Sequence, residues 1–136
     1  MVQLNFDTGL KKYEINGNVI EVNPADAGLY SRIKKSREII DGYAEKYKKA
    51  QINSPDTISD MFANMDRLIR EQIDFIFAAP VAWKIFGNTN CMTPCPNGKA
   101  FYENFLDVLM PVLEKGIEEA YRRSSEHISK YTSQLK

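Results

Sequence analysis

The chain has 136 residues, 43% of them hydrophobic and 26% charged, which suits a single domain with its own core and argues against disorder. Two cysteines are too few for a disulfide scaffold, and no apolar run reaches the roughly 20 residues that span a membrane. The N-terminus lacks the basic-then-apolar pattern of a signal peptide, so we expect a soluble protein of the cytoplasm.

Residues 1–9 predict a strand and a turn. Leu4 and Phe6 stand on alternate positions, which is the period of a half-buried strand. Asp7, Thr8 and Gly9 follow, and this run is typical of a turn. Together with the hairpin that comes next in the chain, the segment predicts a β-meander.

The Asn16-Gly17 dipeptide predicts a β-hairpin. It favours a type I′ turn, because both central residues of that turn need a positive φ. A two-residue loop at this point pairs Tyr13 with Ile20. The apolar side chains then share one face, which must pack on the helices or on another chain, because a hairpin alone is marginal in water. That face comprises Tyr13, Ile15, Ile20 and Val22.

Residues 23–50 predict the first helix. Asn23 is a candidate N-cap, Pro24 suits the first helical position, and Asp26 lies where a negative charge favours the helix dipole. The apolar residues recur at steps of three, four and seven, as expected for one buried face. That face comprises Leu29, Ile33, Ile40, Tyr43 and Tyr47, with Ile39 at its edge.

Residues 54–79 predict the central helix. Ser54 is a candidate N-cap before Pro55, in competition with the capping pair Thr57 and Asp60. Pro80 ends or kinks the helix. Steps of three and four predict a broad buried stripe, with polar residues on the opposite side. The stripe comprises Ile58, Met61, Phe62, Met65, Leu68, Ile69, Ile73 and Ile76. The polar side comprises Asp60, Asp66, Arg67, Arg70, Glu71 and Asp74.

The rest of the chain predicts a short helix, a loop and a last helix. Residues 81–86 continue the apolar pattern up to Gly87, and residues 88–98 hold the breakers of a loop. Residues 101–131 predict the last helix, kinked by Pro111. Its inner side comprises Phe101, Phe105, Leu109, Val112, Leu113, Ile117, Ala120, Tyr121, Ser124 and Ile128.

These elements predict an α+β fold that is mainly α. An N-terminal β-hairpin or meander (residues 1–22) precedes a bundle of three to five helices (residues 23–136), and the chain forms a single domain (residues 1–136).

The formal net charge of +0 conceals an uneven distribution. Residues 32–49 contain seven basic and three acidic side chains, whereas residues 56–74 contain five acidic and two basic ones. We expect these two helices to lie side by side with modest surface pairing. The alternative is a nucleic-acid patch on the first helix, but Tyr43 and Tyr47 follow the core spacing instead of flanking the basic side. The basic clusters are Lys34-Lys35-Arg37 and Lys46-Lys48-Lys49.

No residue pattern predicts catalysis, a metal site or a cofactor. Cys91 and Cys95 supply two thiols where zinc takes four ligands, and their spacing differs from a C-x-x-C redox motif. We expect ordinary reduced thiols, with a metal at a dimer interface or oxidation as the alternatives. His127, the only histidine, lies beside Glu126 on an expected solvated face. We therefore predict that the protein is not an enzyme.

Aromatic and apolar side chains crowd on both sides of Pro80 and next to the loop. They are too many for one helix face, so we expect most of them in the core and some in a partner-binding groove. The candidate partner-binding residues are Phe77, Trp83, Phe86, Phe101 and Tyr102.

The order of these segments resembles the tail assembly chaperones of long-tailed bacteriophages and prophages of Gram-positive bacteria. The similarity covers nearly the whole chain and includes LNFDTGLKKYEINGNVIEVNPADAGLYSRI, FAAPVAWKIFGNTN and KAFYENFLDVLMPVLEKGIEEAY. It rests on segment order and on the short runs F-D-x-G, Y-E-I-N-G, N-P-x-D and a Phe-Gly before the loop. Cys91 and Cys95 are not part of the resemblance.

The resemblance implies a non-enzymatic protein of the host-cell cytoplasm. It implies binding to the tape measure protein and promotion of tail tube assembly, with the tail tube protein as a second candidate partner and a homo-oligomer left open. A chaperone for a helical client needs apolar grooves and flexible surface. Met61, Met65, Met92 and Met110 would supply them, with core filling as the alternative role of these side chains. The alternatives are a structural or adaptor protein of the phage particle and a small helical nucleic-acid-binding domain.

Overall fold

The computed structural model describes residues 1–50 and 53–135. These residues form a two-stranded antiparallel hairpin, β1 (Lys11–Ile15) and β2 (Asn18–Val22), and four helices. The predicted α+β, mainly α fold is therefore confirmed. The helices are α1 (Ala27–Lys49), α2 (Pro55–Phe77), α3 (Val81–Phe86) and α4 (Phe101–Leu135).

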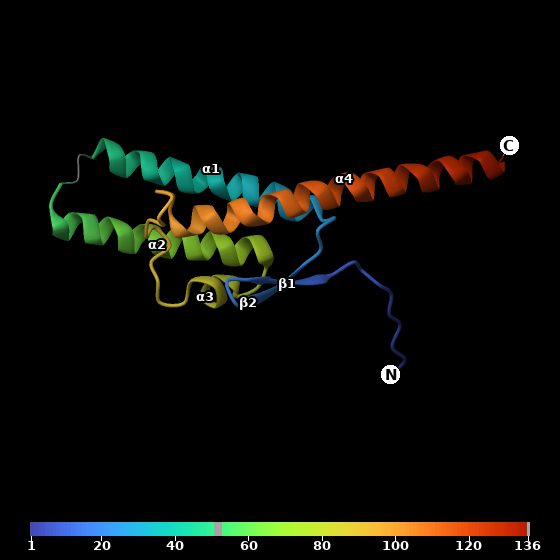
Figure 1. Cartoon of the computed structure of the whole chain (residues 1–136), viewed down its shortest axis with the longest axis horizontal. Coiled ribbons are helices and arrows are strands. Elements are labelled where there is room, and N and C mark those ends of the chain that lie inside the picture. The colour runs from blue at the N-terminus through green and yellow to red at the C-terminus, as the bar shows by residue number, and fades with distance from the viewer. Residues whose placement is uncertain (51–52, 136) are drawn as a thin grey trace.

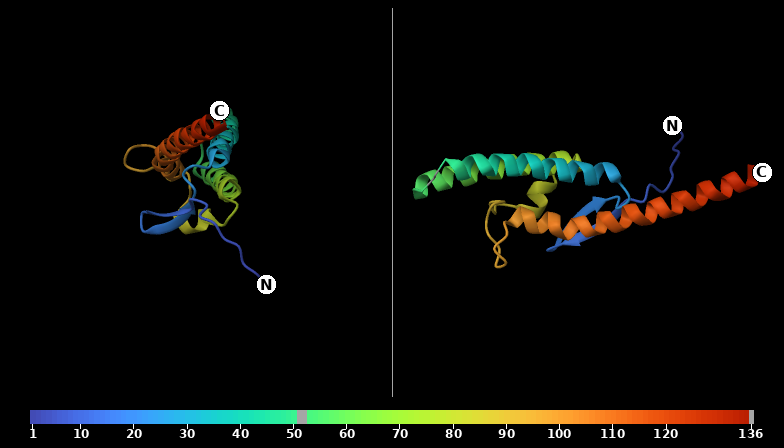
Figure 2. Two further views of the ribbon diagram at one scale, coloured as in Figure 1. Left: turned by 90° about the vertical axis from the view of Figure 1, so that its right-hand side faces the viewer. Right: turned by 90° about the horizontal axis from the view of Figure 1, so that it is seen from above.

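The three long helices pack as a bundle, and the hairpin and α3 lie against one side of it (Figures 1 and 2). α1 lies beside α2 and beside the first half of α4, while α3 joins α2 to β2 (Figures 1 and 2). The second half of α4 extends past the other helices (Figure 1). Both chain ends therefore lie at the same end of the molecule.

A single hydrophobic core lies between these elements. The side chains that α1, α2 and α4 contribute to its centre are fully buried, and each stabilises the fold by roughly 1.5–3 kcal/mol relative to an exposed position. Ile20 and Val22 of β2 close one side of the core, and Phe86 of α3 joins them. The central side chains are Ile33, Ile40, Ile69, Ile73, Ile76, Leu106, Leu109 and Leu113.

The hairpin has the predicted turn and register. Asn16 and Gly17 adopt φ of 50° and 82°, as a type I′ turn requires, and Tyr13 pairs with Ile20. Ile20 and Val22 point into the core, while Glu14, Val19 and Glu21 stay exposed. Local turn chemistry therefore sets this element.

The predicted strand at the start of the chain is wrong. Residues 1–10 form no strand, and Val2, Leu4 and Phe6 are 84%, 89% and 84% exposed. The turn at Gly9 (φ 85°) leads this segment away from β1, so its backbone has no neighbouring strand to pair with. Alternating apolar residues therefore do not form a strand where no neighbouring strand can pair with their backbone.

α1 begins three residues later than the Asn23-Pro24 pattern predicts. Its N-cap is Asp26, whose Oδ1 accepts hydrogen bonds from the backbone N–H groups of Gly28 (2.9 Å) and Leu29 (3.2 Å). Asn23 instead holds a turn: its Oδ1 accepts from the N–H of Ala25, and its Nδ2 donates to the carbonyl oxygen of Thr8 at 2.7 Å. The side chain that looked like a cap thus joins two loops.

The predicted ends of α2 and α3 are confirmed. Ser54 caps α2, and its Oγ accepts from the N–H of Thr57 at 3.2 Å, with Pro55 at the first helical position. α2 ends at Phe77, where Ala78 takes a left-handed conformation (φ 52°) before Pro80. α3 ends at Gly87, which also has a positive φ.

The expected surface pairing between α1 and α2 does not form. Within the described residues no ion pair joins these helices, although they pack together. Arg37 of α1 instead pairs with Asp107 of α4 at 2.8 Å, and Lys99 reaches the same carboxylate at 3.0 Å. Arg32 donates to the carbonyl oxygen of Ile76 near the C-terminal end of α2, where the helix dipole favours a cation.

The predicted buried faces extend too far. α4 passes Pro111 and continues to Leu135, but its inner side is buried only as far as Leu113, and Tyr121 and Ile128 are 75% and 60% exposed. The start of α1 and the turn before it border α4 only as far as about Arg123, and the helix beyond extends past the other described elements (Figure 1). Three other side chains that the pattern assigned to buried faces are also exposed, namely Ile39, Tyr43 and Ile58.

Gly116 marks a close approach between α4 and the turn before α1. A Cβ at this position would come within 2.6 Å of the carbonyl carbon of Pro24 and 2.7 Å of its Cβ. Nothing lies within 4 Å of the same position at Gly42, in the middle of α1. Glycine at position 116 therefore lets the two backbones touch.

We expect Gly116→Ala to destabilise the protein and Gly42→Ala to stabilise it. Overpacking costs about 1–3 kcal/mol, which outweighs the gain in helix propensity because the obstacle at position 116 is backbone. At position 42 only the propensity gain of about 0.5–1 kcal/mol remains. Urea unfolding of both variants measures the difference. Equal effects of the two substitutions would contradict the close approach.

The ion pair at Asp107 predicts a pH dependence. Hydrogen bonds from Arg37 and Lys99 hold the pKa of the Asp107 carboxyl below its usual range. A carboxyl with a lowered folded pKa stabilises the fold above its unfolded pKa of about 4, and this contribution disappears as the pH falls through the folded pKa.

Asp107→Asn should therefore lower Tm at pH 7 and have a shrinking effect below pH 4. The side chain is 37% exposed, so solvent screening keeps the loss small, at most about 1 kcal/mol. Scanning calorimetry across this pH range measures it, with the exposed Asp60→Asn as control. A Tm difference that is constant with pH would count against the pairing.

Candidate partner-binding site

An ion pair on α2 positions the segment that follows this helix. Arg70 Nε lies 3.0 Å from Asp66 Oδ2, one helical turn away, and both side chains are largely shielded from water. The Arg70 Nη2 group also donates to the carbonyl oxygens of Gly87 (2.6 Å) and Thr89 (2.8 Å). One guanidinium thus joins α2 to the loop after α3.

Asp66 also bonds to this loop directly. Its Oδ1 accepts a hydrogen bond from the backbone N–H of Cys91 at 2.7 Å. Further along α2, Asp74 Oδ1 accepts from the N–H of Ala82 at 2.9 Å and so satisfies the start of α3. Asn90 Nδ2 donates to the carbonyl oxygen of Phe62. We call the four side chains Asp66, Arg70, Asp74 and Asn90 the α2 clamp.

The clamp explains what the polar side of α2 does. This side holds α3 and the loop at residues 87–100 in place, because Asp66, Arg70 and Asp74 each bond to backbone groups there. Sequence periodicity showed that these residues lie opposite the apolar stripe, but it gave no signal that a second segment covers them.

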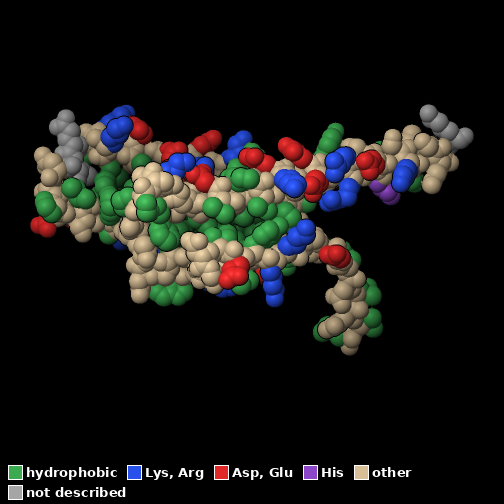
Figure 3. Space-filling view, in the orientation of Figure 1, with side chains coloured by type: hydrophobic (Ala, Val, Ile, Leu, Met, Phe, Trp, Pro, Cys, Tyr) green, Lys and Arg blue, Asp and Glu red, His purple; other side chains and the backbone are tan. Residues whose placement is uncertain are grey.

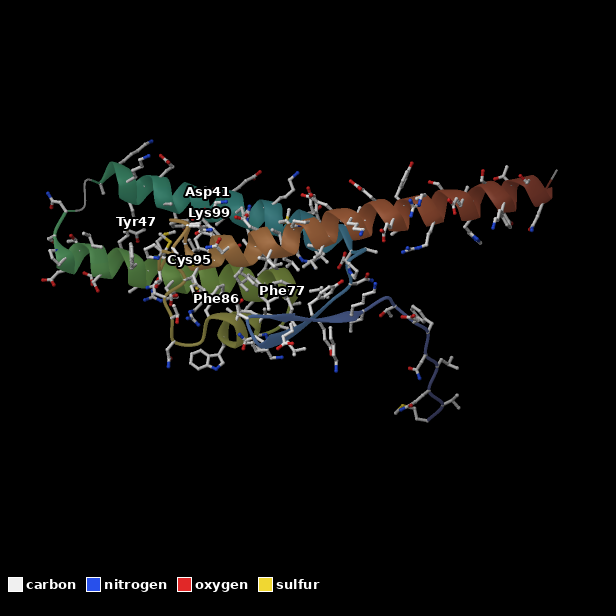
Figure 4. All side chains as sticks on the ribbon, viewed as in Figure 1. Asp41, Tyr47, Phe77, Phe86, Cys95 and Lys99 are labelled. Carbon is white, nitrogen blue, oxygen red and sulfur yellow. The ribbon has the colours of Figure 1, made fainter. Side chains whose placement is uncertain are left out.

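The structure brings four of the five predicted partner-binding residues toward the core. Phe86 and Tyr102 are only 3% and 7% exposed, and Phe77 and Phe101 are partly buried. The Phe86 ring lies edge-on to Phe101 (5.8 Å between centroids) and to Phe105 (5.7 Å), and Phe77 lies 6.1 Å from Phe105. Figure 4 labels Phe77 and Phe86 in this region below α4.

Trp83 alone is placed on the surface. It is 62% exposed on α3, and the Arg70 guanidinium lies 6.0 Å from the centre of its ring. Arg70 is at the same distance from the Phe86 ring. Trp83 is therefore accessible to a partner, whereas Phe86 and Tyr102 stabilise the fold.

The aromatic cluster borders a groove between the hairpin, α3 and α4. This groove has a volume of about 350 Å³. Figure 3 shows hydrophobic side chains at the surface where α4 meets the hairpin. We call it the hairpin groove. Its apolar lining comprises Ile15, Ile85, Phe101, Phe105 and Val108, and its polar lining comprises Glu14, Asn16, Cys95 and Asn104.

A second apolar groove opens between the end of α1 and the start of α2. It has a volume of about 400 Å³ and contains three of the four methionines named above. Tyr47 lies between the two helices near this end (Figure 4), and Lys48 stands at the rim. We call it the methionine groove. Its lining comprises Ala44, Tyr47, Lys48, Ile58, Met61, Met65 and Met92.

The sequence named these methionines as candidate groove residues, but it gave no sign that three of them meet in one groove. Met61 and Met65 were recognisable on α2, but Met92 lies in the loop and reaches them only because the clamp folds that loop back. Periodicity placed Tyr47 and Ile58 on buried faces. The structure leaves Ile58 38% exposed where α1 and α2 separate.

The thiols and the histidine do not assemble a reactive centre. Cys91 is fully buried and free, and burial together with the neighbouring Asp66 raises the pKa of its thiol, so it stays protonated. Cys95 is also free, and His127 is exposed on α4. Among the described residues no three His, Cys, Asp or Glu side chains lie close enough to hold a metal ion. In the same part of the chain, no helix combines the length and apolar character needed to cross a membrane.

The basic clusters of α1 are partly engaged within the fold. Arg37 is paired with Asp107, Lys34 lies 5.5 Å from the centre of the Tyr30 ring, and Lys46 lies 5.0 Å from that of Tyr43. Lysines near the C-terminal end of α1 also complement its dipole. The structure thus gives these charges local partners.

We expect Arg70→Ala to destabilise the protein far more than Arg67→Ala. Removing the Arg70 guanidinium deprives two loop carbonyls and the shielded Asp66 carboxylate of their hydrogen-bond donor. This loss should lower the free energy of unfolding by on the order of 3 kcal/mol. The exposed Arg67 serves as a control, with a change within about 0.5 kcal/mol. Urea unfolding and the rate of proteolysis within residues 87–100 measure the effect. Similar losses in both variants would argue against the clamp.

Comparison of the chain with protein-family models, with curated proteins and with solved structures gives no match. The fold and the grooves therefore carry the functional argument, together with the resemblance in sequence.

Proposed function

We propose that this protein is a phage tail assembly chaperone that binds apolar helical segments of the tape measure protein in the methionine groove. The observation that carries the proposal is that Met61 and Met92, from a helix and a distant loop, line one open apolar groove together with Met65, whose side chain is buried. The resemblance in sequence supplies the identity of the client, and the tail tube protein is a second candidate partner.

The groove has the chemistry of a surface that accepts varied helices. Methionine side chains are unbranched and polarizable, so they repack around different apolar partners. Two flanking helices, α1 and α2, form its walls, which is the arrangement used when an amphipathic helix lies in a groove. Lys48 at the rim favours a client helix with an acidic residue beside its apolar stripe.

The expected affinity is moderate. Burying each large apolar side chain of the client supplies roughly 1.5–3 kcal/mol. After association costs are subtracted, a few such side chains support micromolar binding, about −8 kcal/mol. A chaperone must release its client when the tail tube takes over, so moderate affinity suits the role.

Trp83 is a second contact in the proposal. Its exposure on α3 makes it accessible, and it is the only tryptophan in the chain, so its fluorescence reports any partner that touches it. Phe86 and Tyr102 act through the core and do not touch the client, because they are buried.

Co-expression with the cognate tape measure protein tests the proposal. We expect the parent protein to keep that client soluble and the double variant Met61→Gln, Met92→Gln to lower the soluble fraction several-fold, because polar amides weaken apolar binding. Met110→Gln is the matched control, since Met110 lies outside the methionine groove. Trp83→Ala tests the second contact. Circular dichroism confirms that each variant folds.

Two outcomes would reject the proposal. If the client precipitates equally with and without the parent protein, the chaperone function is wrong. If the groove variant protects as well as Met110→Gln does, the function remains and the methionine groove is not the site. Mass spectrometry of purified particles checks the alternative role, because a chaperone is absent from them and a structural or adaptor protein is retained.

A further inference from the structure

The projecting part of α4 has one face without a partner. The last part of the helix extends past the other elements, and Tyr121, Ile128 and Tyr131 are 75%, 60% and 59% exposed (Figure 1). The buried side chains of α4 all precede this part. Beyond Ile117, which is partly buried beside the start of α1, large apolar side chains therefore recur on a face that no other described element covers.

These side chains follow a heptad pattern. Ile117, Tyr121, Ser124, Ile128 and Tyr131 are separated by alternating steps of four and three, which is the spacing of the a and d positions of a coiled coil. Tyr121 and Ile128 take position a, and the other three take position d. We call these five residues the α4 seam.

Charge is segregated from the seam. The e and g positions beside it hold one charged residue, Glu118, among small or neutral polar ones, whereas the outer b, c and f positions hold the rest of the charges. Charges are excluded from one face of a helix when that face is buried, whereas a helix surrounded by solvent tolerates them on every face. The flanking residues are Glu118, Ala120, Ser125, His127, Thr132 and Gln134. The outer charges are Glu119, Arg122, Arg123, Glu126 and Lys130.

We propose that the α4 seam pairs with the same seam of a second copy of this chain, in antiparallel orientation. This inference does not depend on the chaperone function. The occupant is a second copy because the seam is complementary to itself in size and places no like charges across the contact.

The sizes of the seam residues favour the antiparallel arrangement. Antiparallel helices set each a residue beside a d residue, so Tyr121 lies beside the partner's Tyr131, and Ser124 lies beside the partner's Ile128. The small serine then receives a large side chain. A parallel pair would set Ser124 against the partner's Ser124 and leave a void, which is destabilising.

The antiparallel register fixes the symmetry axis. It passes at the level of residue 126, with Ser125 facing the partner's Ser125 on one flank and His127 facing the partner's His127 on the other. Glu118, the one charge near the seam, lies beside the partner's Thr132. No ionised side chain on the seam or its flanks therefore meets a like charge.

The shape of the molecule permits this pairing, and the small area of the contact predicts a weak dimer. Residues 117–123 still border the start of α1 and the turn before it, but the helix beyond them extends past the other elements (Figure 1). Two bodies would therefore sit at opposite ends of the paired helices. The seam spans about 20 Å at 1.5 Å per residue. Such a contact buries less than the standard interface of about 1,600 Å², so we expect dimers only in the micromolar range or above.

Site-directed cross-linking tests the register. In a Cys95→Ser background, Ser125→Cys should cross-link to a dimer with a short bismaleimide, because this residue faces its own copy across the axis. Ser129→Cys is the matched control on the outer face and should stay monomeric. The native Cys91 is buried and does not react. Equal cross-linking of both variants, or of neither, would overturn the proposed pairing.

Sedimentation equilibrium tests the association itself. The apparent mass of the parent should rise with concentration from 15.6 kDa toward twice that value, and Ile128→Asp should remain a monomer. Because Ile128 is exposed, this variant should keep the fold, which circular dichroism checks. A parent that stays monomeric to several hundred micromolar contradicts the proposal. If only an added client helix shields the seam residues from solvent, that client and not a second copy occupies the seam.

Discussion

The hydrogen-bond network between Asp66, Arg70 and the loop after α3 is the contact on which the two candidate binding grooves depend. A guanidinium is planar, always charged and rich in donors, so Arg70 can hold a carboxylate and two carbonyl oxygens at once. The backbone N–H of Cys91 binds the same carboxylate. With this loop fixed, Met92 reaches its groove and Phe86 enters the core beneath α4.

The short runs that carry the resemblance in sequence meet in the structure as turns and caps. Asn23 of N-P-A-D donates to Thr8 of F-D-T-G, and Asp26 of the same run caps α1. Asn16 and Gly17 form the hairpin turn. Asn16 and Gly17 adopt a positive φ, which few residues do readily, while Asn23 and Asp26 form hydrogen bonds with backbone groups at the turns. They therefore specify the fold, while the grooves that a partner would use are built from ordinary apolar side chains.

The two proposals place different contacts at opposite ends of the molecule. The methionine groove opens where α1 ends and α2 begins, and the α4 seam lies on the far side of the body (Figures 1 and 4). An antiparallel dimer would thus present two grooves that face away from each other. Such a dimer could hold two segments of one long client, and the second contact would then form at a high effective concentration.

The sequence by itself determined the local structure. The hairpin register, the Ser54 cap, the end of α2 and the mainly helical fold all follow from turn chemistry and from periods of 2 and 3.6 residues. These signals depend on neighbours in the chain, so one sequence suffices to find them. The same local signals predicted a first strand that does not form and placed the start of α1 too early, because they do not show whether a partner segment is present.

Only the tertiary structure decided which faces are covered and by what. Periodicity gives Ile73 and Tyr121 equivalent places on their helices, yet one is fully buried and the other is 75% exposed. α1 and α3 pack against α2, whereas the second half of α4 extends past the other helices (Figure 1). Arg37 pairs with Asp107, which lies 70 positions away in the sequence, and no local pattern predicts that pair. A helix face needs a neighbour to become core. Which neighbour it meets is set by long-range packing.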